Sequence, residues 1–159
     1  MRSSGDLPQV YCVRAVEADP QGGGTYVHIQ YMVLCEIARE GLRGTFDILG
    51  TFDRVFVPRL PAQHPRVTVV ALACADTEDD LGEHDVHLIC QLPSGANLFE
   101  QHGRIRFQAL AGAWLGSNRL VMTIGNMPLP ERGRYFFELT VDGVTARHPL
   151  DVIEGAPPG

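Results

Sequence analysis

The sequence predicts an all-β protein, an antiparallel β-sandwich of about eight strands. Short segments alternate apolar and polar residues, which is the period of a strand with one buried face. Glycine and proline turns separate these segments at intervals of roughly 10 to 15 residues. No stretch combines an apolar period of about 3.6 residues with helix caps, so regular helices are not expected. A closed barrel is the alternative arrangement that this pattern leaves open.

The clearest strand pair is a hairpin near the C-terminus. Its first strand alternates polar residues with the apolar residues Tyr135, Phe137, Leu139 and Val141. Asp142-Gly143 supplies a two-residue turn, because both residue types tolerate a positive φ. Pairing across this turn places His148 opposite Phe137 on the apolar face. A histidine there is expected at the edge of the core, with a pH-sensitive function as the alternative.

The other strands are expected over 28–37, 45–57, 66–74, 86–92, 104–109 and 120–124. In the first, strict alternation puts Ile29, Tyr31, Val33, Cys35 and Ile37 on one face. In the second, the pattern slips at Gly50, which predicts a bulge or bend. Segment 66–74 is apolar on both faces, as in a central strand or an oligomer contact. Residues 95–103 could hold one helical turn.

The composition and the missing motifs exclude several classes of function. The net charge of −6 argues against a nucleic-acid-binding protein. All 13 basic residues are arginine, which suggests a bacterial coding bias. The lack of lysine excludes a Schiff-base lysine and a phosphate-loop lysine. No GxSxG elbow, phosphate loop or dinucleotide fingerprint is present, so no enzyme activity and no cofactor are expected.

The chain of 159 residues is expected to form one sandwich domain over 25–153. Residues 1–24 are expected to be a flexible leader or an extra edge strand, and residues 154–159 a flexible tail. The four cysteines form no CxxC pair and are expected to be reduced thiols. No secretory signal and no membrane-spanning segment is recognisable, so a cytoplasmic protein without membrane contact is expected.

Two features link the sequence to known folds. Gly133-x-Tyr135 leads into the hairpin, and a tyrosine there fixes a corner between sheets in immunoglobulin- and fibronectin-like sandwiches. From Tyr31 to Val152, the chain also resembles a family of uncharacterised bacterial proteins, each with one β-sandwich domain. The segments that carry this resemblance are Ile48–Arg54, Phe56–Pro58 with the proline loop after it, Leu129–Tyr135 and Glu138–Gly143. The resemblance implies a fold and no activity.

A metal site is one candidate function. Glu83, Asp85 and His87 share one face of a strand, whereas His84 lies on the other, so the two histidines cannot easily share a metal. A site would need a further ligand from a loop, such as His64 or Asp79. The acidic loop 76–83 offers oxygen ligands for calcium but lacks EF-hand spacing. The candidate ligands are therefore Asp79, Glu83, Asp85, His87 and His64.

A binding surface is the other candidate. Arg104, Arg106 and Arg119 are expected to point outward from neighbouring strands, where they could form an anion- or partner-binding patch. Trp114 lies in a loop of small residues and is either a binding anchor or a plug at the end of the sandwich.

The sequence favours a non-catalytic interaction or scaffolding module that binds a protein partner or itself through loops and sheet edges. The alternative is a metal- or small-ligand-binding enzyme or sensor that uses loop 76–83 with His64 and His87.

Overall fold

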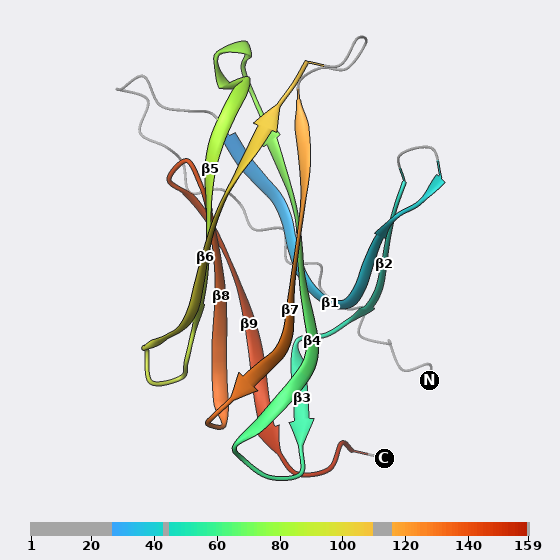
Figure 1. Cartoon of the computed structure of the whole chain (residues 1–159), viewed down its shortest axis with the longest axis vertical. Coiled ribbons are helices and arrows are strands. Elements are labelled where there is room, and N and C mark those ends of the chain that lie inside the picture. Colours follow the sequence, from blue (N-terminus) through green and yellow to red (C-terminus); the bar gives the residue numbers. More distant parts are fainter. Residues whose placement is uncertain (1–26, 43–44, 110–115, 159) are drawn as a thin grey trace, which may run out of the picture.

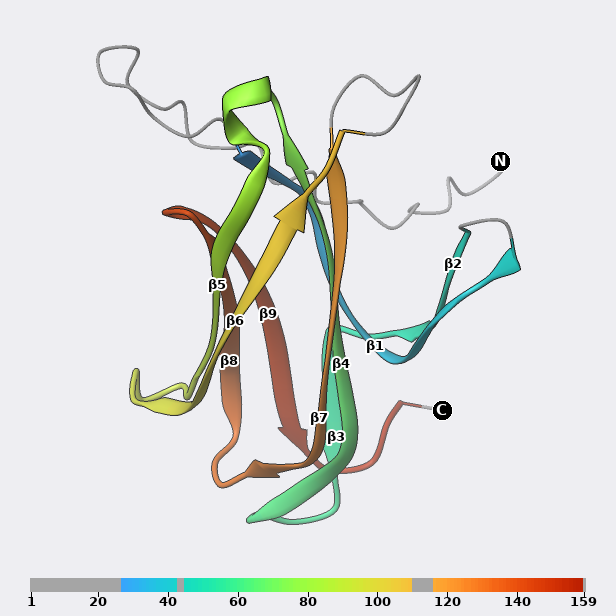
Figure 2. The ribbon, with the colours of Figure 1, turned by 45° about the horizontal axis from the view of Figure 1, so that its top comes forward.

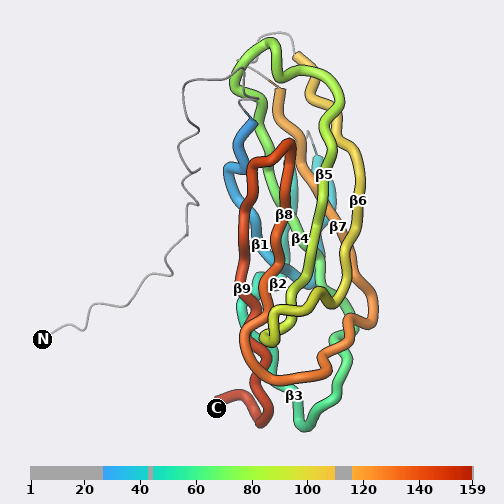
Figure 3. The backbone as a smooth tube through the Cα atoms, turned by 90° about the vertical axis from the view of Figure 1, so that its left-hand side faces the viewer, coloured from blue at the N-terminus to red at the C-terminus, as the bar shows by residue number. Residues whose placement is uncertain are grey.

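Two β-sheets pack face to face in the computed structural model (Figures 1 and 3). The structure describes residues 27–42, 45–109 and 116–158. The four-stranded sheet has the order β2-β1-β4-β7, and the five-stranded sheet has the order β3-β9-β8-β5-β6. The strands are β1 (Val27–Glu40), β2 (Phe46–Thr51), β3 (Arg54–Val57), β4 (Ala62–Ala75), β5 (Gly82–Gln91), β6 (Asn97–Phe107), β7 (Ser117–Leu129), β8 (Gly133–Val141) and β9 (Val144–Glu154). A single 3₁₀ turn, η2 (Glu78–Asp80), precedes β5.

This architecture confirms the predicted immunoglobulin-like β-sandwich. Each sheet is open, with edge strands at both sides, so the closed-barrel alternative is wrong. All pairs within the described sheets are antiparallel except β3 with β9, which is parallel. The predicted leader 1–24 and Trp114 lie outside the described residues.

The expected strand 45–57 is two strands. Gly50 adopts a φ of +65°, a left-handed conformation that favours glycine, and the chain then crosses from one sheet to the other. Its first part is β2, beside β1, and its second part is β3, beside β9. The predicted bend at Gly50 is therefore confirmed, and the additional strand follows from it.

A bulge in β1 reverses the predicted faces of that strand. The register with β4 shifts between Ile29 and Tyr31. One extra residue in a strand moves every following side chain to the opposite face. As a result Met32 and Leu34 enter the core, whereas Ile37 is 43% exposed. The prediction that Tyr31, Val33, Cys35 and Ile37 share the face of Ile29 is wrong for this reason.

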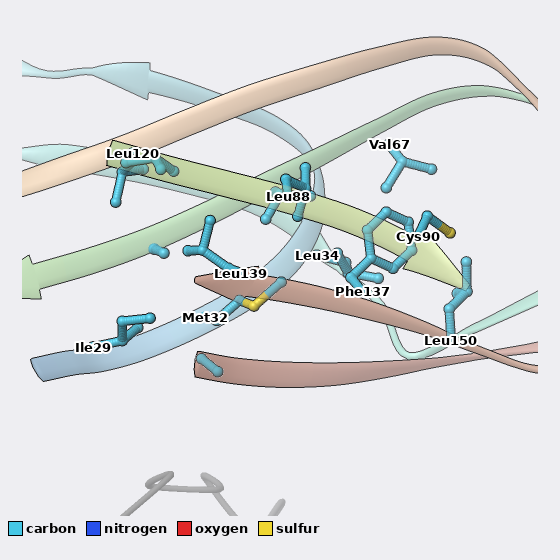
Figure 4. Packing of buried hydrophobic residues seen from close by; sticks show 14 of the residues in the cluster. Ile29, Met32, Leu34, Val67, Leu88, Cys90, Leu120, Phe137, Leu139 and Leu150 are labelled. Carbon is cyan, nitrogen blue, oxygen red and sulfur yellow. The ribbon is translucent and has the colours of Figure 1, made fainter. Parts of the chain in front are cut away.

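The core lies between the two sheets (Figure 4). β4 and β8 contribute most of the side chains that are fully buried there, among them Val67, Val69, Phe137 and Leu139. Burial of each such side chain stabilises the fold by roughly 1.5–3 kcal/mol. Val70 is also fully buried although it points away from this core, whereas Leu72 and Cys74 on the same outer face are half-buried. The predicted central position of this strand is confirmed, but its outer face is not covered along its whole length.

The predicted tyrosine corner is present. The Tyr135 hydroxyl donates to the Glu131 carbonyl at 2.7 Å and accepts from the Glu131 amide at 3.2 Å. These bonds tie the start of β8 to the turn that leaves β7. Burial raises the pKa of Tyr135, so its hydroxyl stays protonated and remains a donor.

The C-terminal hairpin also has the predicted register. Val141 pairs with Val144, and Phe137 pairs with His148. Asp142 and Gly143 have φ values of 47° and 81°, as the turn chemistry requires.

The ends of β1 and β2 form an arm that diverges from the body of the sandwich (Figures 1 and 2). We define this β1–β2 arm as residues 36–42 and 45–51. It carries three exposed apolar side chains: Ile37, Leu42 and Leu49, which are 43%, 88% and 50% exposed.

Candidate functional site

The outer face of β5 and β6 gathers two histidines and a glutamate. His87 on β5 is directly opposite His102 on β6, and their rings stack with centroids 4.1 Å apart and planes 9° from parallel. Glu100 lies two residues before His102, on the same face of β6. The possible ligand atoms of these three residues lie within 4.8 Å of one another. We call these residues the His-Glu-His cluster.

The carboxylate of Glu100 approaches both rings. One oxygen lies 3.3 Å from His102 Nε2, and the other lies 3.7 Å from His87 Nε2. The latter nitrogen is buried and has no hydrogen-bond partner. A surface pocket of about 460 Å³ adjoins the two rings, and Thr140, Asp142 and Gly143 complete its wall.

Only one member of this cluster, His87, was predicted from the sequence. Glu100 and His102 were missed because residues 95–103 were expected to hold a helical turn, whereas β6 begins at Asn97. The prediction of a helical turn there is wrong. Glu100-x-His102 was the available signal, since residues two apart in a strand share a face.

The other predicted ligands lie elsewhere. Asp85 and Glu83 are on the predicted face of β5 but contact Arg104, at 3.3 and 3.9 Å. Asp79 is exposed in η2. Within the described residues, the His-Glu-His cluster is the only group of three or more close metal-ligating side chains. The acidic loop 76–83 therefore does not gather its carboxylates around one point.

His64 is on β4, in the opposite sheet from His87. Its ring lies against Phe52, with centroids 5.3 Å apart, and its Nδ1 atom is buried without a hydrogen-bond partner. Burial lowers the pKa of His64. A pocket of about 650 Å³ adjoins it, lined in part by Arg54 and Arg59. The structure therefore places His64 and His87 in two different pockets.

His84 lies on the opposite face of β5 from His87, as predicted, and is only 7% exposed. Its Nδ1 atom bonds the Asp142 carboxylate, and its Nε2 atom bonds the Asp80 carbonyl at 2.6 Å. The Asp80 carboxylate in turn accepts from Thr77. These bonds give His84 a structural role at the junction of η2, β5 and the β8–β9 turn.

The three predicted arginines do not lie side by side in one sheet. Arg104 and Arg106 are on β6, whereas Arg119 is on β7 of the other sheet. The two strands meet where Asn118 donates to the Arg106 carbonyl at 3.1 Å. The Arg119 guanidinium lies 6.0 Å from the ring centroid of Phe46 on the β1–β2 arm.

Solved structures with a similar arrangement have low sequence identity. An alkylpurine DNA glycosylase from Pseudomonas fluorescens, bound to DNA containing an abasic site analog, shows 8% identity and a TM-score of 0.46; the match covers 82% of this chain and 31% of that one. A beta-glucosidase from Listeria innocua shows 7% identity and a TM-score of 0.46, with coverages of 83% and 17%. The chain thus spans about a third or less of these two structures.

A third similar structure is comparable in length. It is an immunoglobulin-like protein from Pseudomonas aeruginosa, with 15% identity, a TM-score of 0.41 and coverages of 82% of this chain and 99% of that one. Among curated proteins, none matches the chain in sequence.

Within the described residues, no helix has the length and apolar character needed to cross a membrane. The resemblance seen in the sequence over Tyr31 to Val152 is confirmed by a match over residues 30–153. On this match, the chain belongs to the family of unknown function DUF6941.

Proposed function

We propose that this protein is a non-catalytic interaction module that associates with a second copy of itself through the free edge of β2. The observation that carries this proposal is the exposure of Leu49 and Ile37, which are directly paired on one face of the β1–β2 arm. Strand addition at a sheet edge supplies backbone hydrogen bonds, and alternate side chains supply specificity.

The edge strands of the two sheets differ in how well they are protected against pairing with another chain. Natural edge strands avoid unwanted pairing by charge, proline, shortness or irregular backbone. β6 carries exposed Glu100, Arg104 and Arg106, and β3 has only four residues. β7 contains Pro128 and a residue of positive φ, Asn126.

β2 has little of this protection. Its sequence is FDILGT, without proline, and its only charged residue is Asp47. Its one irregular position is Gly50, which has a positive φ and lies next to the end of the strand. The Asp47 carboxylate already accepts from Arg39 on β1 at 3.2 Å. Among the edges of the described sheets, β2 is therefore the one best suited to accept another strand.

The residues of β2 suit pairing with a second copy. In a twofold antiparallel pair with Leu49 opposite its own counterpart, Asp47 lies opposite Thr51 of the second copy, and like charges do not meet. Each Leu49 carries Ile37 beside it on the same face, so two copies bring four apolar side chains together. This arrangement would join the two four-stranded sheets into one.

Multi-angle light scattering of the purified full chain tests the proposal. The measurement is made with a metal chelator over a range of protein concentrations, so that a bridging metal cannot cause association. We expect a dimer that Leu49→Glu converts to a monomer.

Val121→Glu is the matched control. Val121 is 41% exposed on the β7 edge of the same sheet, so this change adds the same charge at a similar apolar position. The control is expected to remain dimeric. A wild-type chain that stays monomeric at every concentration would overturn the proposal, as would equal dissociation of both variants.

A further inference from the structure

We propose that the His-Glu-His cluster binds one divalent transition-metal ion, with His87, Glu100 and His102 as ligands. The site lies on the outer face of the five-stranded sheet, apart from the β1–β2 arm in the four-stranded sheet. It is independent of the self-association proposed above.

The spacing of the three residues follows from the strand register. Directly opposite residues on antiparallel strands have Cβ atoms about 4.5–5.5 Å apart, and diagonal neighbours remain within reach of long side chains. His87 and His102 are directly opposite, and Glu100 is diagonal to His87. Three adjacent positions on one face thus bring their ligand atoms within 4.8 Å of one another.

The present distances are close to those of a coordinated ion. Ligands about 2.1 Å from a tetrahedral metal are about 3.4 Å from one another. One Glu100 oxygen lies 3.3 Å from His102 Nε2, and its other oxygen lies 3.7 Å from His87 Nε2. The two rings would have to tilt out of their parallel stack, so that their nitrogen lone pairs converge on the ion.

A second observation points to a missing ligand. His87 Nε2 is buried and forms no hydrogen bond, although buried polar atoms are normally paired. A metal ion would provide that partner. Arg104, the nearby cation, pairs with Asp85 and Glu83.

The ligand types select the metal class. Imidazole nitrogens with one carboxylate suit zinc, copper, nickel and iron, whereas calcium and magnesium prefer oxygen ligands alone. Three protein ligands leave at least one coordination position for water. Bound metal would also hold the edge strand β6 to β5.

Isothermal titration calorimetry of the untagged full chain with zinc chloride tests this site. We expect one zinc ion per chain. His102→Gln and Glu100→Gln should each weaken zinc binding by at least about tenfold, since loss of outer-sphere partners alone costs 10- to 100-fold. Both residues are exposed, so the substitutions leave the core intact.

His28→Gln is the matched control, because His28 is another surface histidine, whose ring lies 2.8 Å from the carboxylate of Asp76. The same titrations on the Leu49→Glu background separate metal binding from self-association. The proposal is overturned if no zinc binds, if His102→Gln leaves the affinity unchanged, if His28→Gln weakens binding equally, or if calcium competes at equal concentration.

Discussion

His84 on β5 and Asp142 in the β8–β9 turn are joined by a hydrogen bond that links segments 58 residues apart. The other ring nitrogen of His84 bonds the Asp80 carbonyl. The ring therefore bridges a side-chain oxygen of the hairpin turn and a backbone oxygen of η2. One buried ring thereby fixes the η2 turn and the hairpin turn to the same strand.

Asp142→Asn should lower the free energy of unfolding by about 1 kcal/mol, because the amide oxygen can still bond His84 but lacks the charge that strengthens the bond. Asparagine tolerates the positive φ of this position, so the turn itself is retained. Urea denaturation followed by circular dichroism measures the change. Asp79→Asn, in the exposed part of η2, should change stability by less than about 0.5 kcal/mol. Equal losses in the two variants would contradict the role given to His84.

Tyr135→Phe tests the tyrosine corner. The substitution keeps the buried ring but removes the hydroxyl that bonds both backbone groups of Glu131. The expected loss in unfolding free energy is about 0.5–1.5 kcal/mol per hydrogen bond, again measured with urea. Tyr31→Phe, at a half-buried position on β1, is the control and should have a smaller effect. A Tyr135→Phe protein as stable as the wild type would contradict the corner.

Stability should fall as the pH decreases below about 6.5, the ordinary pKa of histidine. Burial lowers the pKa of His64 and His148, and the backbone bond of His148 to Pro149 opposes the shift only in part. Below this pH the unfolded chain takes up protons that the folded protein does not, so acidification favours unfolding. Thermal melts between pH 8 and pH 5.5 would show the effect as a falling Tm, and His148→Gln should make the decrease smaller. His28→Gln is the control. If Tm falls with decreasing pH as steeply in His148→Gln as in His28→Gln, this assignment is contradicted.

Salt should strengthen self-association. Each copy carries a net charge of −6, and the proposed contact between β2 strands is apolar rather than ionic. Screening of the repulsion should therefore lower the dimer dissociation constant by a few-fold between roughly 20 mM and 300 mM sodium chloride. Sedimentation equilibrium measures this constant. Weaker association at the higher salt concentration would indicate a contact made by ion pairs.

Much of the fold could be read from the sequence because turn chemistry and alternation are local. Three features predicted in this way are present in the structure: the hairpin turn at Asp142-Gly143, the tyrosine corner at Tyr135 and the bend at Gly50. The bulge after Ile29 could not be read, because it depends on how β1 pairs with β4. A single extra residue there reversed the faces of Met32 and of every residue that follows in the strand.

The candidate site could be predicted even less well than the fold, because it depends on which residues of neighbouring strands are paired. His87 was visible as an outward histidine, but its partners come from β6, and the sequence does not specify which residue of β6 lies opposite it. The register places His102 there and Glu100 diagonally. Likewise, the exposed pair of Ile37 and Leu49 exists only through the pairing of β1 with β2.

Disulfide trapping of Leu49→Cys tests the central claim, self-association through β2, most directly. Opposed residues on antiparallel strands have Cα atoms about 4.5–5.5 Å apart, within the range that a disulfide spans. Under mild oxidation, Leu49→Cys should give a covalent dimer on non-reducing gels, whereas wild type and Val121→Cys should remain monomers. If Leu49→Cys yields no more covalent dimer than Val121→Cys, the two copies do not meet at Leu49 and the account is contradicted.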